Sequence, residues 1–138
     1  MYDSIPAEDS KVSSDRPIAT VKIARGSMPA PPSKSATQRA LVAAALAAGR
    51  SRLRHPLLAD DSRHLITALD AIGIATRLSG PVEAPEIEIE GRGGAIPAGD
   101  VRLSVGNAGT AMRFLTAMLT LGRGEYVIDG RAHQVRLR

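Results

Sequence analysis

The residues best suited to chemistry lie in one short segment, Ser33–Arg39 (SKSATQR), which follows two prolines. The prolines favour an extended approach, and the apolar run after the segment is typical of a helix. Ser33 or Ser35 could cap that helix by accepting hydrogen bonds from free backbone N–H groups. A helix N-terminus that carries Lys34 in its first turn and Arg39 a turn later favours a carboxylate or a phosphate. The segment predicts an anion-binding site.

A second segment, Gly106–Thr110 (GNAGT), has the same character. It lies between an expected strand and an expected helix, and its two glycines would let the backbone approach a ligand closely. A tight turn capped by Thr110 is the alternative, although such a turn needs only one glycine. Arg113 lies one turn into the expected helix, where it could serve packing or charge balance. The sequence therefore predicts two anion-binding loops, each at a helix N-terminus.

The charged residues also have purely structural explanations. Lys34 could be a solvated loop lysine, and Arg39 could form a surface salt bridge on the helix. Asp60, Asp61 and His64 could suggest a metal cluster, but helix capping explains the two acids, and no further ligand group stands nearby in the sequence. We expect no metal site.

Several common catalytic motifs are not matched. A P-loop needs glycines where this chain has Met28 and Ser33, and Gly91–Gly94 (GRGG) lacks the dinucleotide-binding spacing and is typical of a linker. His55 and His133 have no matching nucleophile or acid. A P-loop enzyme and a hydrolytic triad are therefore excluded.

The composition narrows the possible partners. The 138 residues carry a net charge of +4, which favours anionic partners. Aromatic residues make up only 2%, so few side chains could stack on bases, and nucleic-acid binding is disfavoured. The chain has no cysteine, no apolar run long enough for a membrane span and no signal-peptide core near its N-terminus. We expect a cytoplasmic protein with an aliphatic core.

The apolar pattern predicts repeated βαβαββ units in an α/β (α+β) fold. Residues 1–16 are polar and are expected to form a flexible leader, and residues 17–138 to form part of one domain. The first unit is expected to contain strands over 17–24, 52–54, 74–78 and 86–90, a helix over 35–48 ended by Gly49, and a helix from Asp60–Ser62 to Gly73. The second is expected to contain a strand over 101–105, a helix over 111–121 and a strand over 126–128. One full unit and part of a second suggest a fragment.

Three motifs occur in the same order and spacing in one known family: SKSATQRAL at Ser33–Leu41, ADDS at Ala59–Ser62 and GNAGTAMR at Gly106–Arg113. From Pro17 to Arg138 the chain resembles the N-terminal portion of the EPSP synthase (3-phosphoshikimate 1-carboxyvinyltransferase) family, the enolpyruvyl transferases of the shikimate pathway of aromatic amino acid biosynthesis. The resemblance implies a two-domain, monomeric full-length enzyme that uses no metal or organic cofactor. The implied reaction transfers the enolpyruvyl group of phosphoenolpyruvate to the 5-hydroxyl of shikimate 3-phosphate, with release of phosphate through a tetrahedral intermediate.

The resemblance also implies roles for individual residues. Lys34 would contact both substrates, and Ser35 and Arg39 would hold shikimate 3-phosphate. The family's acid and base carboxylates lie in the other domain, so we expect no catalytic residue here and no turnover by this chain alone. The residues expected at the phosphoenolpyruvate site, besides Lys34, are Asn107, Gly109, Thr110 and Arg138, with Arg136 as the alternative to Arg138.

Three positions depart from the residues usual in the family. Pro32 replaces a glycine and Gln38 an asparagine, which could stiffen the first loop. Phe114 replaces a proline at a position that tunes the fit to phosphoenolpyruvate and to the inhibitor glyphosate. A non-catalytic anion-binding α/β module is the alternative function. Under either reading the expected partners are small anionic molecules, and neither nucleic acid nor a membrane.

Overall fold

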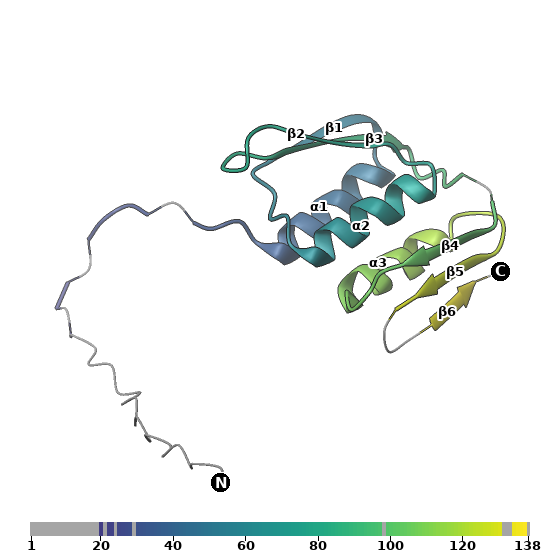
Figure 1. Ribbon diagram of the computed structural model, residues 1–138. Coiled ribbons are helices and arrows are strands. Elements are labelled where there is room, and N and C mark those ends of the chain that lie inside the picture. The colour runs from purple at the N-terminus through teal and green to yellow at the C-terminus, as the bar shows by residue number, and fades with distance from the viewer. Residues whose placement is uncertain are drawn as a thin grey trace, which may run out of the picture.

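Two small β-sheets enclose a layer of helices (Figure 1). The computed structural model describes residues 20, 22–23, 25–28, 30–97, 99–130 and 134–137. No helix among these residues has the length and apolar character needed to cross a membrane. The described elements are α1 (Lys34–Leu46), β1 (Ala48–Arg54), α2 (Asp60–Ala71), β2 (Thr76–Ser79), β3 (Glu86–Arg92), β4 (Val101–Ser104), α3 (Gly109–Leu119), β5 (Tyr126–Asp129) and β6 (Gln134–Leu137).

The first sheet has the strand order β1-β3-β2, and both of its strand pairs are antiparallel. Its middle strand alternates as the sequence predicts, because Ile87 and Ile89 are fully buried while the alternating glutamates 86, 88 and 90 lie on the outer face. β1 begins at Ala48, earlier than predicted, because it pairs with β3 along its whole length. Long-range pairing, which the local pattern does not reveal, extends this strand.

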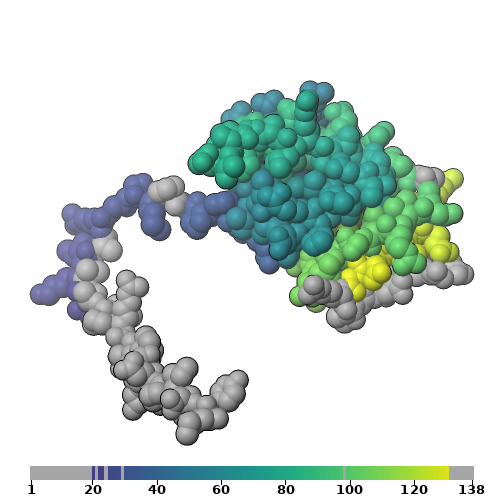
Figure 2. Space-filling view, in the orientation of Figure 1, coloured from purple at the N-terminus to yellow at the C-terminus, as the bar shows by residue number. Residues whose placement is uncertain are grey.

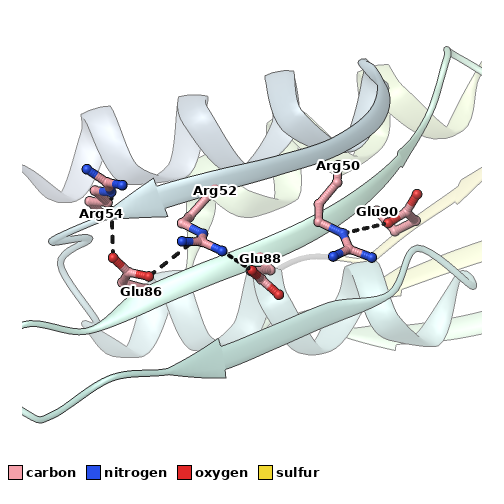
Figure 3. Close-up of polar contacts among 6 residues, drawn as sticks. All are labelled: Arg50, Arg52, Arg54, Glu86, Glu88 and Glu90. Carbon is pink, nitrogen blue, oxygen red and sulfur yellow. Dashed lines mark hydrogen bonds and ion pairs between the residues drawn. The ribbon is translucent and has the colours of Figure 1, made fainter.

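Three arginines of β1 face three glutamates of β3 on the outer surface of this sheet (Figure 3). The ion pairs are Arg50–Glu90 (3.4 Å), Arg52–Glu88 (2.8 Å), Arg52–Glu86 (3.8 Å) and Arg54–Glu86 (3.6 Å). Each exposed pair contributes less than about 1 kcal/mol. Together they favour one register, because a slip by one residue would turn the charges toward the core.

The second sheet has the order β4-β5-β6. β4 and β5 are parallel and are joined through α3, whereas β6 is antiparallel to β5. The strand–helix–strand order predicted for the second unit is therefore present. The two units differ after this point, because α2 follows β1 in the first unit and β6 follows β5 directly in the second.

The core between the sheets is aliphatic, as the composition predicts. Leu41 of α1, Leu69 of α2 and Leu115 of α3 are fully buried. α2 packs against both α1 and α3, and α1 also contacts α3, so the three helices pack against one another (Figure 1). Tyr126 is a buried exception to the aliphatic core, and its hydroxyl donates a hydrogen bond to the Pro97 carbonyl (2.9 Å).

Two predictions about element ends have opposite outcomes. Gly73 closes α2 as expected, with φ +83° and its N–H donating to the Asp70 carbonyl (3.0 Å). The prediction that Gly49 ends α1 is wrong, because the helix already stops at Leu46 and Gly49 lies inside β1. Of the predicted strand over 17–24, residues 20, 22 and 23 are described and lie outside any strand. The rest of that strand and the leader over 1–16 lie outside the described residues.

The ion pairs on the first sheet generate a stability prediction. Glu88 lies opposite Arg52 on β1 and opposite Arg77 on β2. Glu88→Lys should lower the free energy of unfolding by about 1–2 kcal/mol, because it places like charges on both sides of one position. Urea denaturation would measure the loss, which should shrink at high salt. Glu83→Lys, in the exposed turn between β2 and β3, is the control; an equal loss there would contradict the role of strand pairing.

Candidate anion-binding site

The first predicted loop leads directly into α1, which begins at Lys34. Ser33 is the N-cap residue, and its Oγ accepts a hydrogen bond from the Ala36 N–H (3.3 Å). Of the two serines that the sequence offered for this role, the structure therefore uses Ser33. Ser35 and Arg39 are exposed and four residues apart, so they lie on one outward face of α1 and are available to a ligand.

Unlike Ser35 and Arg39, Lys34 points toward α2. Its Nζ lies 3.0 Å from Oδ2 of Asp61, and 53% of its side chain is exposed. An ion pair this exposed contributes less than about 1 kcal/mol, so an anionic ligand could compete with Asp61 for the lysine. Arg39 forms no ion pair or hydrogen bond within the described part of the chain. The alternative that it forms a surface salt bridge therefore finds no support there.

The second predicted loop forms a turn that ends in the first residues of α3. The Ala108 N–H donates to the Val105 carbonyl (2.9 Å), and Gly106 has φ +55°, a value that favours glycine. Gly109 is different, because its φ is not positive and a Cβ built on it would meet no atom within 4 Å. Nothing in the described structure requires glycine at 109. Open space beside a helix N-terminus is what close approach of a ligand needs.

The three described helices differ in how their N-termini are compensated. Ser33 caps α1, and two aspartates lie in the first turn of α2. The N-cap of α3 is Ala108, with no side-chain hydrogen bond and no acidic residue in the first turn. Thr110, the predicted cap under the turn explanation, lies inside α3 and is exposed. The N-terminus of α3 is therefore the one among these helices that has neither a side-chain cap nor an acidic residue in its first turn, which leaves its positive end unbalanced.

The two loops lie at the same end of the molecule. The three helices run in one direction, with their N-termini together (Figure 1). The first turns of α2 lie between the loops: Asp61 contacts Lys34, and His64 lies against Gly106, where an added Cβ would be 2.7 Å from Nε2. The loops thus meet the same end of α2, although within the described residues no hydrogen bond or ion pair joins Lys34 directly to the second loop.

Asp60 and Asp61 do not cap α2, because its N-cap is Ala59 without a side-chain hydrogen bond. Both acids lie in the first turn instead, where the helix dipole favours negative charge. Arg138 lies outside the described residues, so its predicted contact with a ligand stays a prediction.

The sequence did not reveal the surroundings of Gln38. This side chain follows Lys34 by four residues on α1 and is only 1% exposed. Neither its Oε1 nor its Nε2 has a hydrogen-bond partner among the described residues, and the same holds for the buried Oγ of Ser62 on α2. An unpartnered buried amide costs about 1–3 kcal/mol. Only its spacing of three residues from the buried Leu41 could have suggested that this residue faces inward.

A groove of about 770 Å³ lies outside this constellation. It is bounded by the loop before α2 and by the β2–β3 hairpin, which projects at the end of the molecule where α1 begins (Figure 2). Its lining is mainly apolar, with Leu57, Leu58, Leu78 and Val82 among the contributors, and it includes none of the predicted site residues. We place the candidate site at the helix N-termini because the groove lacks their concentration of amides and cations.

Comparison with known proteins agrees with this mixed helix–sheet fold and its paired loops. A sequence model of the EPSP synthase (3-phosphoshikimate 1-carboxyvinyltransferase) family matches residues 18–137. The 3-phosphoshikimate 1-carboxyvinyltransferase of Trichormus variabilis is 44% identical over 117 residues, which are 84% of this chain and 25% of that protein. The protein of the same name from Salmonella arizonae is 47% identical over 116 residues, or 83% of this chain and 26% of the relative.

The solved structures give the same result. EPSP synthase from Acinetobacter baumannii matches with a TM-score of 0.67 and 30% identity, covering 78% of this chain and 24% of that one. This chain is thus an α/β protein, and it belongs to the EPSP synthase family. It spans about a quarter of the length of the curated relatives that it matches.

The two glycines of the second loop generate contrasting predictions. Gly106→Ala should lower the free energy of unfolding by about 1–3 kcal/mol, because alanine is strained at φ +55°. Gly109→Ala should leave it unchanged or raise it by up to about 1 kcal/mol, since the site is open and alanine restricts the unfolded chain. Urea denaturation of both variants would test this. A large loss for Gly109→Ala would mean that the fold itself requires that glycine.

Proposed function

We propose that this chain supplies one half of a site for enolpyruvyl transfer from phosphoenolpyruvate to shikimate 3-phosphate. The observation that carries the proposal is the uncompensated N-terminus of α3, which lies at the same end of the molecule as Lys34. Both substrates carry several negative charges. Free helix amides and cationic side chains are the groups that bind such charges.

The two loops have different proposed ligands. Shikimate 3-phosphate lies against the outward face of α1, where Ser35 and Arg39 are both exposed. Phosphoenolpyruvate lies at the N-terminus of α3, near the exposed Asn107, Gly109 and Thr110. The Gly109 position leaves open space for it.

Lys34 is the residue that is proposed to contact both ligands. Its half-exposed ammonium group lies at the start of α1 and contacts the first turn of α2. From there it would contact both substrates and stabilise negative charge as the phosphate leaves. The fit of the second loop to glyphosate and a monomeric full-length enzyme also stay predictions from the family resemblance, and a cytoplasmic location stays a prediction from the composition.

The chain is not expected to complete the reaction alone. Proton transfer needs a positioned acid and base, and the nearest carboxylate to Lys34, that of Asp61, is paired with the lysine. We therefore expect the 138-residue chain to bind both substrates and to release no phosphate. It should become active only when the remaining part of the enzyme is supplied.

Binding and complementation together test the proposed function. NMR titration with phosphoenolpyruvate should shift the amide signals of Asn107, Gly109 and Thr110, and shikimate 3-phosphate should shift those of Ser35 and Arg39. Adding the rest of the Salmonella arizonae relative as a separate polypeptide should then give phosphate release. Binding without any release would favour the non-catalytic anion-binding module. No binding of either substrate would contradict both functions.

Lys34 and Asp61 form a matched pair of variants. Lys34→Ala should weaken the binding of both substrates by about 10-fold or more, since each loses a charge-assisted hydrogen bond. Asp61→Asn breaks the same ion pair but leaves the lysine charged and free, so binding should stay equal or become tighter. Titration calorimetry would compare them. If Lys34→Ala weakened only one substrate, the shared contact would be wrong.

A further inference from the structure

None of the roles predicted from the sequence uses His64, because it was considered only as a metal ligand and no metal site is expected. It is the fifth residue of α2, is half-buried, and forms no hydrogen bond or ion pair within the part of the chain that the structure describes. Its ring lies against the backbone of Gly106: a Cβ added there would be 2.7 Å from Nε2 and 3.1 Å from Cε1. The ring therefore fills the space beside this glycine.

Gly106 is the residue at which the second loop changes direction. β4 ends at Ser104, and α3 begins at Gly109. Between them Gly106 has φ +55°, and the turn is closed by the hydrogen bond from the Ala108 N–H to the Val105 carbonyl. A side chain that fixes Gly106 therefore fixes the direction in which the chain enters α3.

The same helix contacts the first loop. Asp61 precedes His64 by three residues, so the two side chains lie on one face of α2. Asp61 contacts Lys34 and His64 contacts Gly106, so this face spans the distance between the two loops. The fully buried Leu65 anchors the same part of α2 in the core. The helix is thus a rigid spacer between the two predicted binding segments.

We propose that His64 is a positioning residue, which holds the Gly106–Thr110 loop so that its amides and Lys34 converge on one pair of anions. The inference rests on the proposed function for the identity of those anions. The ring acts through shape, as a wall behind Gly106, and takes no part in proton transfer. A planar ring of similar size should therefore replace it, whereas a small side chain should release the loop.

Three variants of the 138-residue chain test the role of the ring. His64→Ala should shift the amide NMR signals of Asn107, Gly109 and Thr110 in the free protein. It should weaken phosphoenolpyruvate binding by about tenfold while changing shikimate 3-phosphate binding by less than about twofold, because only the second loop loses its support. His64→Phe should restore both the signals and the affinity. Thr67→Ala, exposed on the next turn of α2, should leave all of them unchanged.

A double-mutant cycle tests the contact without any ligand. Gly106→Ala meets the His64 ring as well as an unfavourable φ, whereas in a His64→Ala background only the unfavourable φ remains. The drop in the urea midpoint caused by Gly106→Ala should therefore be smaller in the His64→Ala background. Equal drops in the two backgrounds would show that the ring does not constrain Gly106.

The possible outcomes separate the two proposals. If the parent chain binds phosphoenolpyruvate and His64→Ala binds it equally well, the positioning role is wrong and the proposed function stands. If His64→Ala weakens both substrates equally, or if His64→Phe fails to restore binding, a positioning role through ring shape is also overturned. If the parent chain binds neither substrate, the proposed function fails, and the loop amide signals with the double-mutant cycle still decide whether His64 positions the loop.

Discussion

The structure depends on three helices that point the same way. Their positive ends gather at one edge of the molecule, where each helix leaves backbone N–H groups without intrahelical partners. Two of the helices are compensated within the protein, α1 by the hydroxyl of Ser33 and α2 by the aspartates of its first turn. The third has only Ala108 at its cap. The electrostatic imbalance is therefore concentrated at α3, and an external anion would correct it.

The distribution of arginines agrees with this interpretation. The arginines of β1 are paired with glutamates of β3, so the first sheet uses much of its positive charge internally. Arg39 on α1 and Arg113 on α3 are exposed and have no ion pair within the described residues, although both lie in the N-terminal half of a helix. A cation near the positive end of a helix is unfavourable by itself. An anionic ligand between the helices would make the positions of these arginines favourable, because each would then lie near a negative charge.

The sequence predicted the features that depend on local pattern. The strict alternation of β3, the closing glycine at 73 and the two loops before α1 and α3 all follow from residues close together in the chain. It failed where a residue's role depends on distant partners. Gly49 suits a helix end, but pairing with β3 draws it into β1. His64 was considered only as a metal ligand beside two acids, because nothing in the local sequence indicates that Gly106 lies against its ring.

The site depends more on geometry than on charge. An anion at Lys34 must exchange with Asp61, and because that pair is half-exposed the exchange costs less than about 1 kcal/mol. The lysine therefore keeps most of its contribution to binding, but one flexible charge does not fix where the anion lies. What remains is the direction of the free amides at α3, which follows from the turn at Gly106. The packing of α2 between the two loops therefore determines whether the separate anion-binding elements act as one site.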